Sequence, residues 1–258
     1  MAEPLILALE PGWLVAAKPA GMHTAPLEAG EGGTLLAWLG ERHPEVLAVR
    51  GRKSVEGGLL HRLDRETSGL VLAARDQAAF DALMELSESG GILKRYSAVC
   101  RPSFSPAPGR RELLAPLGWT IHAWAEILHA LDSGPTWPTM TIRSAFRAYG
   151  PGRRLVAAVT ESAAGPVYET RLSAIEPVPA AESAFAARVE LRRGFRHQVR
   201  CHLASVGLPL IGDPLYGPPG AAGRLLLHAE SLEFSDPLTG EARSFRLPAD
   251  WGADRHGG

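Results

Sequence analysis

The segment from residue 69 to residue 100 constrains the fold of this chain more than any other. Its first part, GLVLAA at residues 69–74, is an apolar run that predicts a buried strand. Asp76 follows and can cap a helix, whose apolar residues recur at helical spacing until Gly90-Gly91 stops it. The run ILKRYSAVC at residues 92–100 predicts the next strand. The segment therefore has the order strand, helix, strand.

The rest of the chain adds more strands than helices. Strands and helices do not alternate strictly, which favours an α+β fold around a mixed, largely antiparallel sheet. Residues 102–165 show no clear period and are expected to be irregular, with a surface loop at RPSFSPAPGRR. We expect one domain over residues 1–258. The further predicted elements are a strand at 13–17, a helix from Thr34, strands at 166–178 and 184–192, a helix at 195–206 and a hairpin at 225–248.

Composition is that of an ordinary globular protein. The 258 residues are 45% hydrophobic, enough to bury a sizeable core, and the net charge is −1. An anionic partner would therefore have to be met by a local basic face. Cys100 and Cys201 lack metal-ligand spacing and are expected to be buried, reduced thiols. No signal peptide or membrane-spanning run is visible, so a cytoplasmic protein without membrane contact is expected.

Asp64 lies in the stretch HRLDRETSGL and has two possible roles. With Thr67 and Ser68 it could hydrogen-bond the backbone of a tight turn closed by Gly69. Alternatively, a carboxylate in an apolar setting stays ionised when a cation pairs with it, and then serves as a nucleophile or base. Its sequence neighbours Arg62 and Arg65 need not be that cation, because adjacent residues of an extended segment point to opposite faces.

A second dense region, RVELRRGFRHQVRCHLASVG, contains five arginines and one acidic residue. Such a basic run is usually a solvated face. Arg200 is different, because it lies within the predicted helix at the border of the apolar stripe, where a charge needs an anion. Arg196, one turn earlier, is better placed to contact phosphate.

These residues carry a resemblance to a known family. HRLDRETSGL resembles the H-R-L-D-x-x-T-S-G signature of the RluA family of pseudouridine synthases. Four further segments are similar to that family in the same order: LVAAKPAGMHTAP, LKRYSAVC, GFRHQVRCHLASVGLPLIGDPLYG and LLLHAESLEF. Together the five segments span residues 13 to 234, which is most of the chain.

The resemblance implies isomerisation of uridine to pseudouridine in ribosomal or transfer RNA, without cofactor or metal. Asp64 would be the catalytic carboxylate, either a nucleophile at ribose C1′ or a base at C2′. Arg62 would enter the space left when the uridine is flipped out of its stack. Tyr96 would stack on the uracil or assist removal of the C5 proton. Arg200 would pair with Asp64, and Arg196 would contact RNA.

Two departures from the family pattern are visible. The first matching segment begins near residue 13, so we expect no N-terminal S4-type RNA-binding domain and a monomer that grips RNA with its catalytic domain. The family reads G-R-x-H-Q-I-R where this chain has GFRHQVR, which displaces the first arginine by one place to Arg196. Two alternatives remain open: an inactive RNA-binding protein that retains the fold, and a carboxylate-dependent hydrolase, for which no second acid or metal cluster is apparent.

Overall fold

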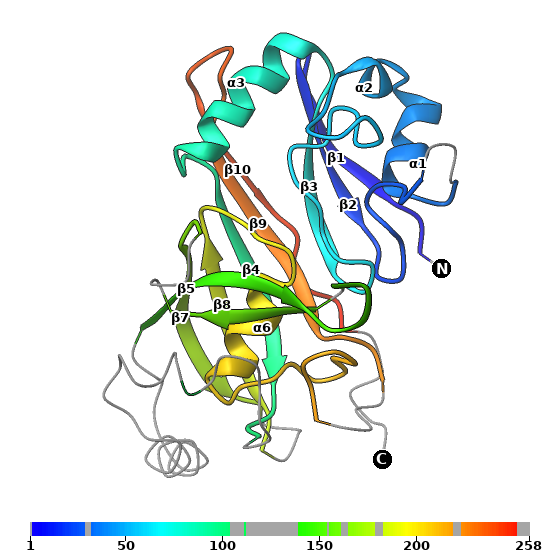
Figure 1. Cartoon of the computed structure of the whole chain (residues 1–258). Coiled ribbons are helices and arrows are strands. Elements are labelled where there is room, and N and C mark those ends of the chain that lie inside the picture. The colour runs from blue at the N-terminus through cyan, green and yellow to red at the C-terminus, as the bar shows by residue number, and fades with distance from the viewer. Residues whose placement is uncertain are drawn as a thin grey trace. The chain divides into compact units, whose positions relative to one another are not determined.

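The computed structural model describes part of the chain and divides it into two compact units (Figure 1). Unit 1 comprises Met1–Arg95 and His228–Ala249, and unit 2 comprises Tyr96–Leu227 and Asp250–Gly258. Among the described residues, no helix is both long and apolar enough to cross a membrane. The described residues are 2–28, 32–103, 111, 139–153, 155–160, 165–178, 183–218 and 223–251.

The strands of unit 1 run in the order β1-β2-β3-β9, and β10 pairs with β9. The β1-β2, β2-β3 and β9-β10 pairs are antiparallel, whereas β3 and β9 are parallel. The described part of this unit also contains α1, which Thr34 caps through its side chain, the short α2, and α3, which Asp76 caps. The elements are β1 (Leu5–Leu9), β2 (Trp13–Lys18), α1 (Leu35–Arg42), α2 (Glu45–Ala48), β3 (Ser68–Ala74), α3 (Gln77–Glu88), β9 (Leu227–Ser235) and β10 (Ala242–Arg246).

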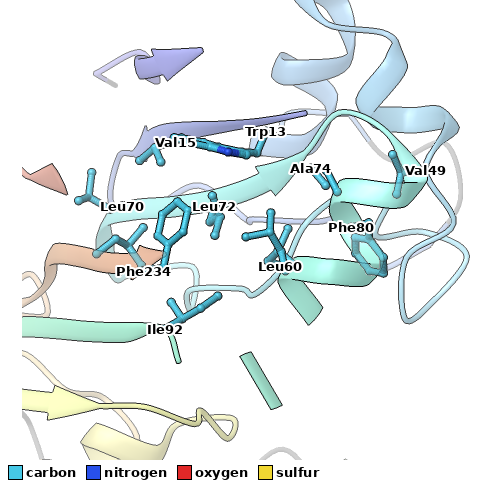
Figure 2. Packing of buried hydrophobic residues seen from close by; sticks show 13 residues of the cluster. Trp13, Val15, Val49, Leu60, Leu70, Leu72, Ala74, Phe80, Ile92 and Phe234 are labelled. Atoms are coloured by element: carbon cyan, nitrogen blue, oxygen red, sulfur yellow. The ribbon is translucent and has the colours of Figure 1, made fainter. Parts of the chain in front are cut away.

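The core of unit 1 gathers around Trp13 and Leu72 (Figure 2). The Trp13 ring meets Phe234 edge-on, with centroids 5.2 Å apart. All seven residues of β3 are buried, as the apolar run predicted. Burial of this cluster, at about 25 cal/mol per Å² of apolar surface, is the main stabilising contribution in this unit. Its members are Trp13, Val15, Val49, Leu60, Leu70, Leu72, Ala74, Ala79, Phe80, Leu83, Ile92, Leu232 and Phe234.

The strands of unit 2 run in the order β4-β8-β7-β5-β6, and β5 is antiparallel to both β6 and β7. Strand β4 begins in unit 1 and continues into unit 2 from Tyr96. A single turn of 3₁₀ helix, Pro151–Arg153, follows β5. The elements are β4 (Leu93–Cys100), β5 (Met140–Tyr149), β6 (Leu155–Val159), β7 (Tyr168–Pro177), β8 (Phe185–Leu191) and α6 (Gln198–Ser205).

The predicted α+β class with largely antiparallel pairing is confirmed, but three local expectations are wrong. Residues 102–165 were expected to be irregular, yet β5 and β6 lie within them; the predicted loop at residues 101–111 falls mostly outside the described residues. A further strand, β1, precedes the first one expected. The helix expected from residue 195 begins only at Gln198. Whether the chain forms a single catalytic domain stays a prediction.

Candidate active site

Asp64 lies in a loop of unit 1, residues 61–67, that we call the Asp64 loop. The loop joins residues 58–60 to strand β3, and the two sides are bonded antiparallel: Ala74 N donates to Gly58 O at 2.8 Å and Leu60 N to Leu72 O at 3.0 Å. At its tip, Thr67 N donates to Asp64 O at 3.1 Å, which closes a turn. Asp64 is therefore the first residue of a turn, with Arg65 and Glu66 at its corners, that leads into a fully buried strand.

The residue before Asp64 is fixed on both of its backbone groups. The Thr24 hydroxyl accepts from Leu63 N at 3.1 Å and donates to Leu63 O at 2.7 Å, and all of these groups are buried. One hydroxyl thus satisfies a donor and an acceptor that burial would otherwise leave unpaired. After Asp64, Arg65 O accepts from Gly21 N at 2.8 Å. The backbone is held on either side of the carboxylate.

Lys18, at the end of β2, also hydrogen-bonds the backbone of the Asp64 loop. The residue is 1% exposed, and its ammonium group donates to Pro19 O, Met22 O and Arg65 O at 2.9, 2.7 and 3.2 Å. Burial lowers the Lys18 pKa to about 8, although the carboxylates of Asp64 and Glu66 oppose that shift. A buried cation therefore acts on Asp64 from within unit 1. Sequence reasoning missed this residue; a lysine closing an apolar strand before a Pro-Ala-Gly turn was the available signal.

The Thr-Ser-Gly part of the motif has structural reasons of its own. Gly69 has φ +120° where β3 meets β9, and a Cβ there would lie 2.3 Å from Ala229 O, so only glycine fits. The Ser68 hydroxyl is 2.8 Å from His228 Nδ1, and the Thr67 hydroxyl is buried without a hydrogen-bond partner. These side chains do not hydrogen-bond the turn in the way that the structural alternative for the motif assumed.

Arg62 lies beside Asp64 in sequence but is held elsewhere. Its Nη1 is 3.1 Å from Glu56 Oε1, and its side chain is 44% exposed. The Glu56 side chain is only 9% exposed, so the pair joins a half-exposed guanidinium to a nearly buried carboxylate.

Arg200 lies in α6 of unit 2 and is 1% exposed. It was expected at the border of an apolar stripe, but all eight residues of α6 are buried, so the helix has no solvent face. The expected need for an anion is met by Asp213, which accepts from Arg200 Nε at 2.9 Å and Nη2 at 2.7 Å. This bidentate pair is the strongest geometry available to the two groups. The pairing of Arg200 with Asp64 stays a prediction.

Asp213 is itself held in place. Its Oδ1 also accepts from Leu215 N at 2.8 Å and Tyr216 N at 3.1 Å. The Tyr216 ring lies 5.5 Å from the Arg200 guanidinium, and its hydroxyl accepts from Val156 N at 2.9 Å. Asp213 was not selected from the sequence, although it lies in the segment GDPLYG of a matching motif. The available signal was an Asp-Pro turn after an arginine-bearing helix.

Tyr96 and Arg196 occupy different settings in unit 2. Tyr96 is 8% exposed and alternates on β4 with Lys94 and Ala98, so these three share one face of the strand. Arg196 is exposed and precedes α6, which corrects its expected place in the first turn of that helix. The cause is His197, whose left-handed backbone at φ 56° prevents the helix from starting earlier.

The structure thus places Asp64 and Arg62 in unit 1, and Tyr96, Arg200 and Arg196 in unit 2. In the part of the chain that is described, no group of three or more His, Cys, Asp or Glu side chains could hold a metal ion. Cys100 and Cys201 are buried and unbonded to each other, as expected, and burial raises the pKa of each thiol to about 12.

Comparison with known proteins defines the family. Residues 12–205 match the model of the RNA pseudouridylate synthase family. The chain is 30% identical over 240 residues to an uncharacterized RNA pseudouridine synthase of Chloroflexus aurantiacus, covering 90% of this chain and 62% of that protein. It is 32% identical over 243 residues to the ribosomal large subunit pseudouridine synthase D of Xanthomonas campestris, covering 88% and 60%. The chain therefore belongs to the RNA pseudouridylate synthase family, and the resemblance recognised in its sequence is confirmed.

Solved structures agree with this assignment at the level of the fold. The human RNA pseudouridylate synthase domain containing 1 aligns over 98% of this chain and 86% of its own, with a TM-score of 0.65 and 20% identity. The chain spans about three fifths of the length of the two sequence relatives above, at 62% and 60%.

Proposed function

We propose that this chain isomerises specific uridines in RNA to pseudouridine. In that reaction the C1′–N1 glycosidic bond breaks, C1′ joins C5 of the same uracil, and the C5 proton is lost while N1 gains one. Atoms and electrons balance within the substrate, so the proposal requires neither cofactor nor metal. The observation that carries it is the Asp64 loop: a carboxylate at the start of a turn whose backbone is held by Thr24, Gly21 and Lys18.

The fixed backbone around Asp64 supports a role as nucleophile or base. Catalytic groups gain most when the protein fixes them before substrate arrives, because reorganisation then costs nothing during the reaction. The Asp64 carboxylate acts on the charge of the buried Lys18, so the two side chains interact electrostatically. Attack at C1′ and proton removal at C2′ both remain open for Asp64.

The other proposed roles follow the family motifs. Arg200 would pair with Asp64; Asp213 already binds its Nε and Nη2, which orients the guanidinium. Tyr96 would stack on the uracil or assist removal of the C5 proton. Arg62 would release Glu56 and fill the space of the flipped uridine.

RNA is the proposed partner, either ribosomal or transfer RNA, and Arg196 is proposed to contact its backbone. The relative named for the ribosomal large subunit supports the ribosomal choice. We further propose that the protein acts in the cytoplasm, where the substrate RNA is found. We also propose that it is a monomer.

The test is to map pseudouridines in total RNA from cells with and without the gene, and then with the gene restored as wild type or as Asp64→Asn. One or a few sites should disappear on deletion and return only with the wild-type gene. An unchanged map would contradict the proposal and favour an RNA-binding protein without turnover. Return of the sites with Asp64→Asn would remove Asp64 from the chemistry.

A further inference from the structure

Three stacked rings in unit 2 run from the core to the surface. Phe146 of β5 lies parallel to Phe195, with centroids 4.9 Å apart and 1° between the planes. Phe146 is also stacked on His202 of α6 at 4.8 Å. His202 is fully buried, whereas Phe195 is 36% exposed and is the outermost of the three. The stack therefore ends in an aromatic ring at the surface.

Both ends of this stack are fixed by hydrogen bonds. The two ring nitrogens of His202 lie 2.8 Å from the Ser144 hydroxyl and 2.7 Å from the Thr170 hydroxyl. At the outer end, Gln198 Oε1 accepts from Phe195 N at 2.9 Å while its Nε2 donates to Glu169 O at 2.9 Å. Phe195 is thus held before any ligand arrives, and a ring that is already ordered loses little entropy on binding.

The surface around Phe195 is aromatic and basic. Tyr168 lies 5.1 Å from Phe195, and the Arg193 guanidinium lies 5.8 Å from the Tyr168 ring. Arg196 is exposed, and its Nη2 donates to Arg153 O at 2.7 Å. This bond holds the Arg196 charge near the 3₁₀ turn Pro151–Arg153. The run LRRGFRH at residues 191–197 contains no acidic residue. A flat aromatic ring beside arginines suits a base with phosphates on either side of it.

We propose that Phe195 is a stacking platform for one unpaired base of the RNA, a base other than the uridine that is isomerised, with Arg193 and Arg196 contacting its flanking phosphates. The inference rests on the proposed function, because it takes RNA as the partner. It adds a contact that selects for single-stranded sequence beside the target, since any base can stack whereas a paired one is not accessible.

The experiment measures binding of a fluorescent oligouridylate of about twelve nucleotides, and of the same oligomer with its bases removed. Phe195→Ala should weaken binding of the base-bearing oligomer by about 5- to 100-fold, and leave the abasic oligomer unchanged. Phe195→Tyr should bind like wild type. Phe195→Leu keeps apolar contact with Phe146 but lacks a flat face, so it should lose the same base-dependent binding as Phe195→Ala. It keeps the test valid if Phe195→Ala destabilises the fold. The matched control is Leu5→Ala, which removes a side chain 59% exposed in unit 1 and should change neither affinity.

Two results would overturn the platform: equal binding of the base-bearing oligomer by wild type and both non-aromatic variants, or an equal loss for the abasic oligomer. Single-turnover isomerisation of total RNA at saturating protein separates this proposal from the proposed function. If wild type makes pseudouridine and Phe195→Leu binds normally, only the platform fails. If wild type makes none while the base-dependent loss persists, only the proposed function fails. A variant that binds normally but has lost the chemical step would place Phe195 at the target uridine instead.

Discussion

The Asp64 loop of unit 1 and helix α6 of unit 2 hold their candidate catalytic residues by different means. Around Asp64 the fixing bonds go to the backbone: a hydroxyl, an amide and one buried ammonium bind Leu63 and Arg65. Around Arg200 the fixing bonds are between side chains, in a fully buried bidentate pair with Asp213. None of the bonds that fix the Asp64 loop is made by the Asp64 side chain, so they survive its substitution, whereas substitution of Arg200 removes its own ion pair. The two regions should therefore respond differently to substitution.

The largest expected effect is loss of the buried ion pair. Arg200→Met removes the guanidinium and leaves the buried, charged Asp213 without its cation. The free energy of unfolding, measured by urea titration, should fall by about 3–5 kcal/mol. Arg200→Met with Asp213→Leu should recover part of that loss, since no unpaired charge remains. The matched control is Arg52→Met, which breaks an ion pair with Glu88 whose two side chains are 53% and 68% exposed, and should cost about 0–1 kcal/mol. Equal losses for Arg200→Met and Arg52→Met would contradict the comparison.

Acid should weaken unit 2 through His202. Burial lowers the pKa of His202 from 6.5 to about 3, so the unfolded chain takes up a proton that the folded chain refuses as pH falls below about 6.5. Stability is therefore lost as pH falls, by about 2 kcal/mol at pH 5 from this residue. His202→Gln, which retains hydrogen-bonding capacity toward Ser144 and Thr170, should show a correspondingly smaller fall between pH 7.5 and 5. An unaltered pH dependence in that variant would rule this origin out.

Lys18→Met tests the backbone bonding of unit 1. It removes three part-buried hydrogen bonds to backbone carbonyls but also relieves the burial of a charge, so a net loss of about 1–2 kcal/mol is expected. Because the Lys18 pKa is lowered to about 8, the unfolded chain holds more protons between pH 8 and 10.5, and the contribution of Lys18 to stability rises over that range. Turnover should fall over the same range as the cation beside Asp64 is lost. A rate that is flat through pH 9 would show that the Lys18 charge does not act on Asp64.

Arg196→Met should have the smallest effect on stability, within about 0.5 kcal/mol, because the side chain is exposed. Its expected consequence is weaker RNA binding, with the slope of log affinity against log salt shallower by about one, since one phosphate contact is lost. The chemical step at saturating RNA should be unchanged. If Arg196→Met abolishes that step while Arg200→Met retains it, the two roles are exchanged.

The sequence predicted those elements whose signal is local. Asp76 and Thr34 cap the helices that were predicted to begin after them, and every residue of the apolar strand β3 is buried. Strand β5 was not predicted because alanine and arginine dilute its alternation. Its pairing with β6 is local, but its pairing with β7 joins distant residues such as Met140 and Leu172. The start of α6 depends on the left-handed His197, which local propensity disfavours.

The candidate site residues also divide into those with a local sequence signal and those defined by distant contacts. Asp64 could be selected because its motif is contiguous, and Arg200 because a charge within an apolar helix needs a partner. Lys18 and Asp213 were missed, because the local signal at each does not indicate the contacts they make across 47 and 13 residues of sequence. The partner of a buried charge is chosen by the tertiary fold, and sequence spacing carries little information about it.

The most direct test of the account is the single-turnover rate of Asp64→Asn on RNA that wild type modifies, with binding and unfolding measured on the same samples. Asn keeps the shape of the side chain but cannot act as nucleophile or base, while affinity rests mainly on phosphate contacts. Glu66→Gln is the matched control, since it removes the other carboxylate near Lys18 and should react within about threefold of wild type. We expect Asp64→Asn to bind and fold like wild type and to make no pseudouridine. Turnover above a few per cent of the wild-type rate would contradict the claim that Asp64 carries the reaction.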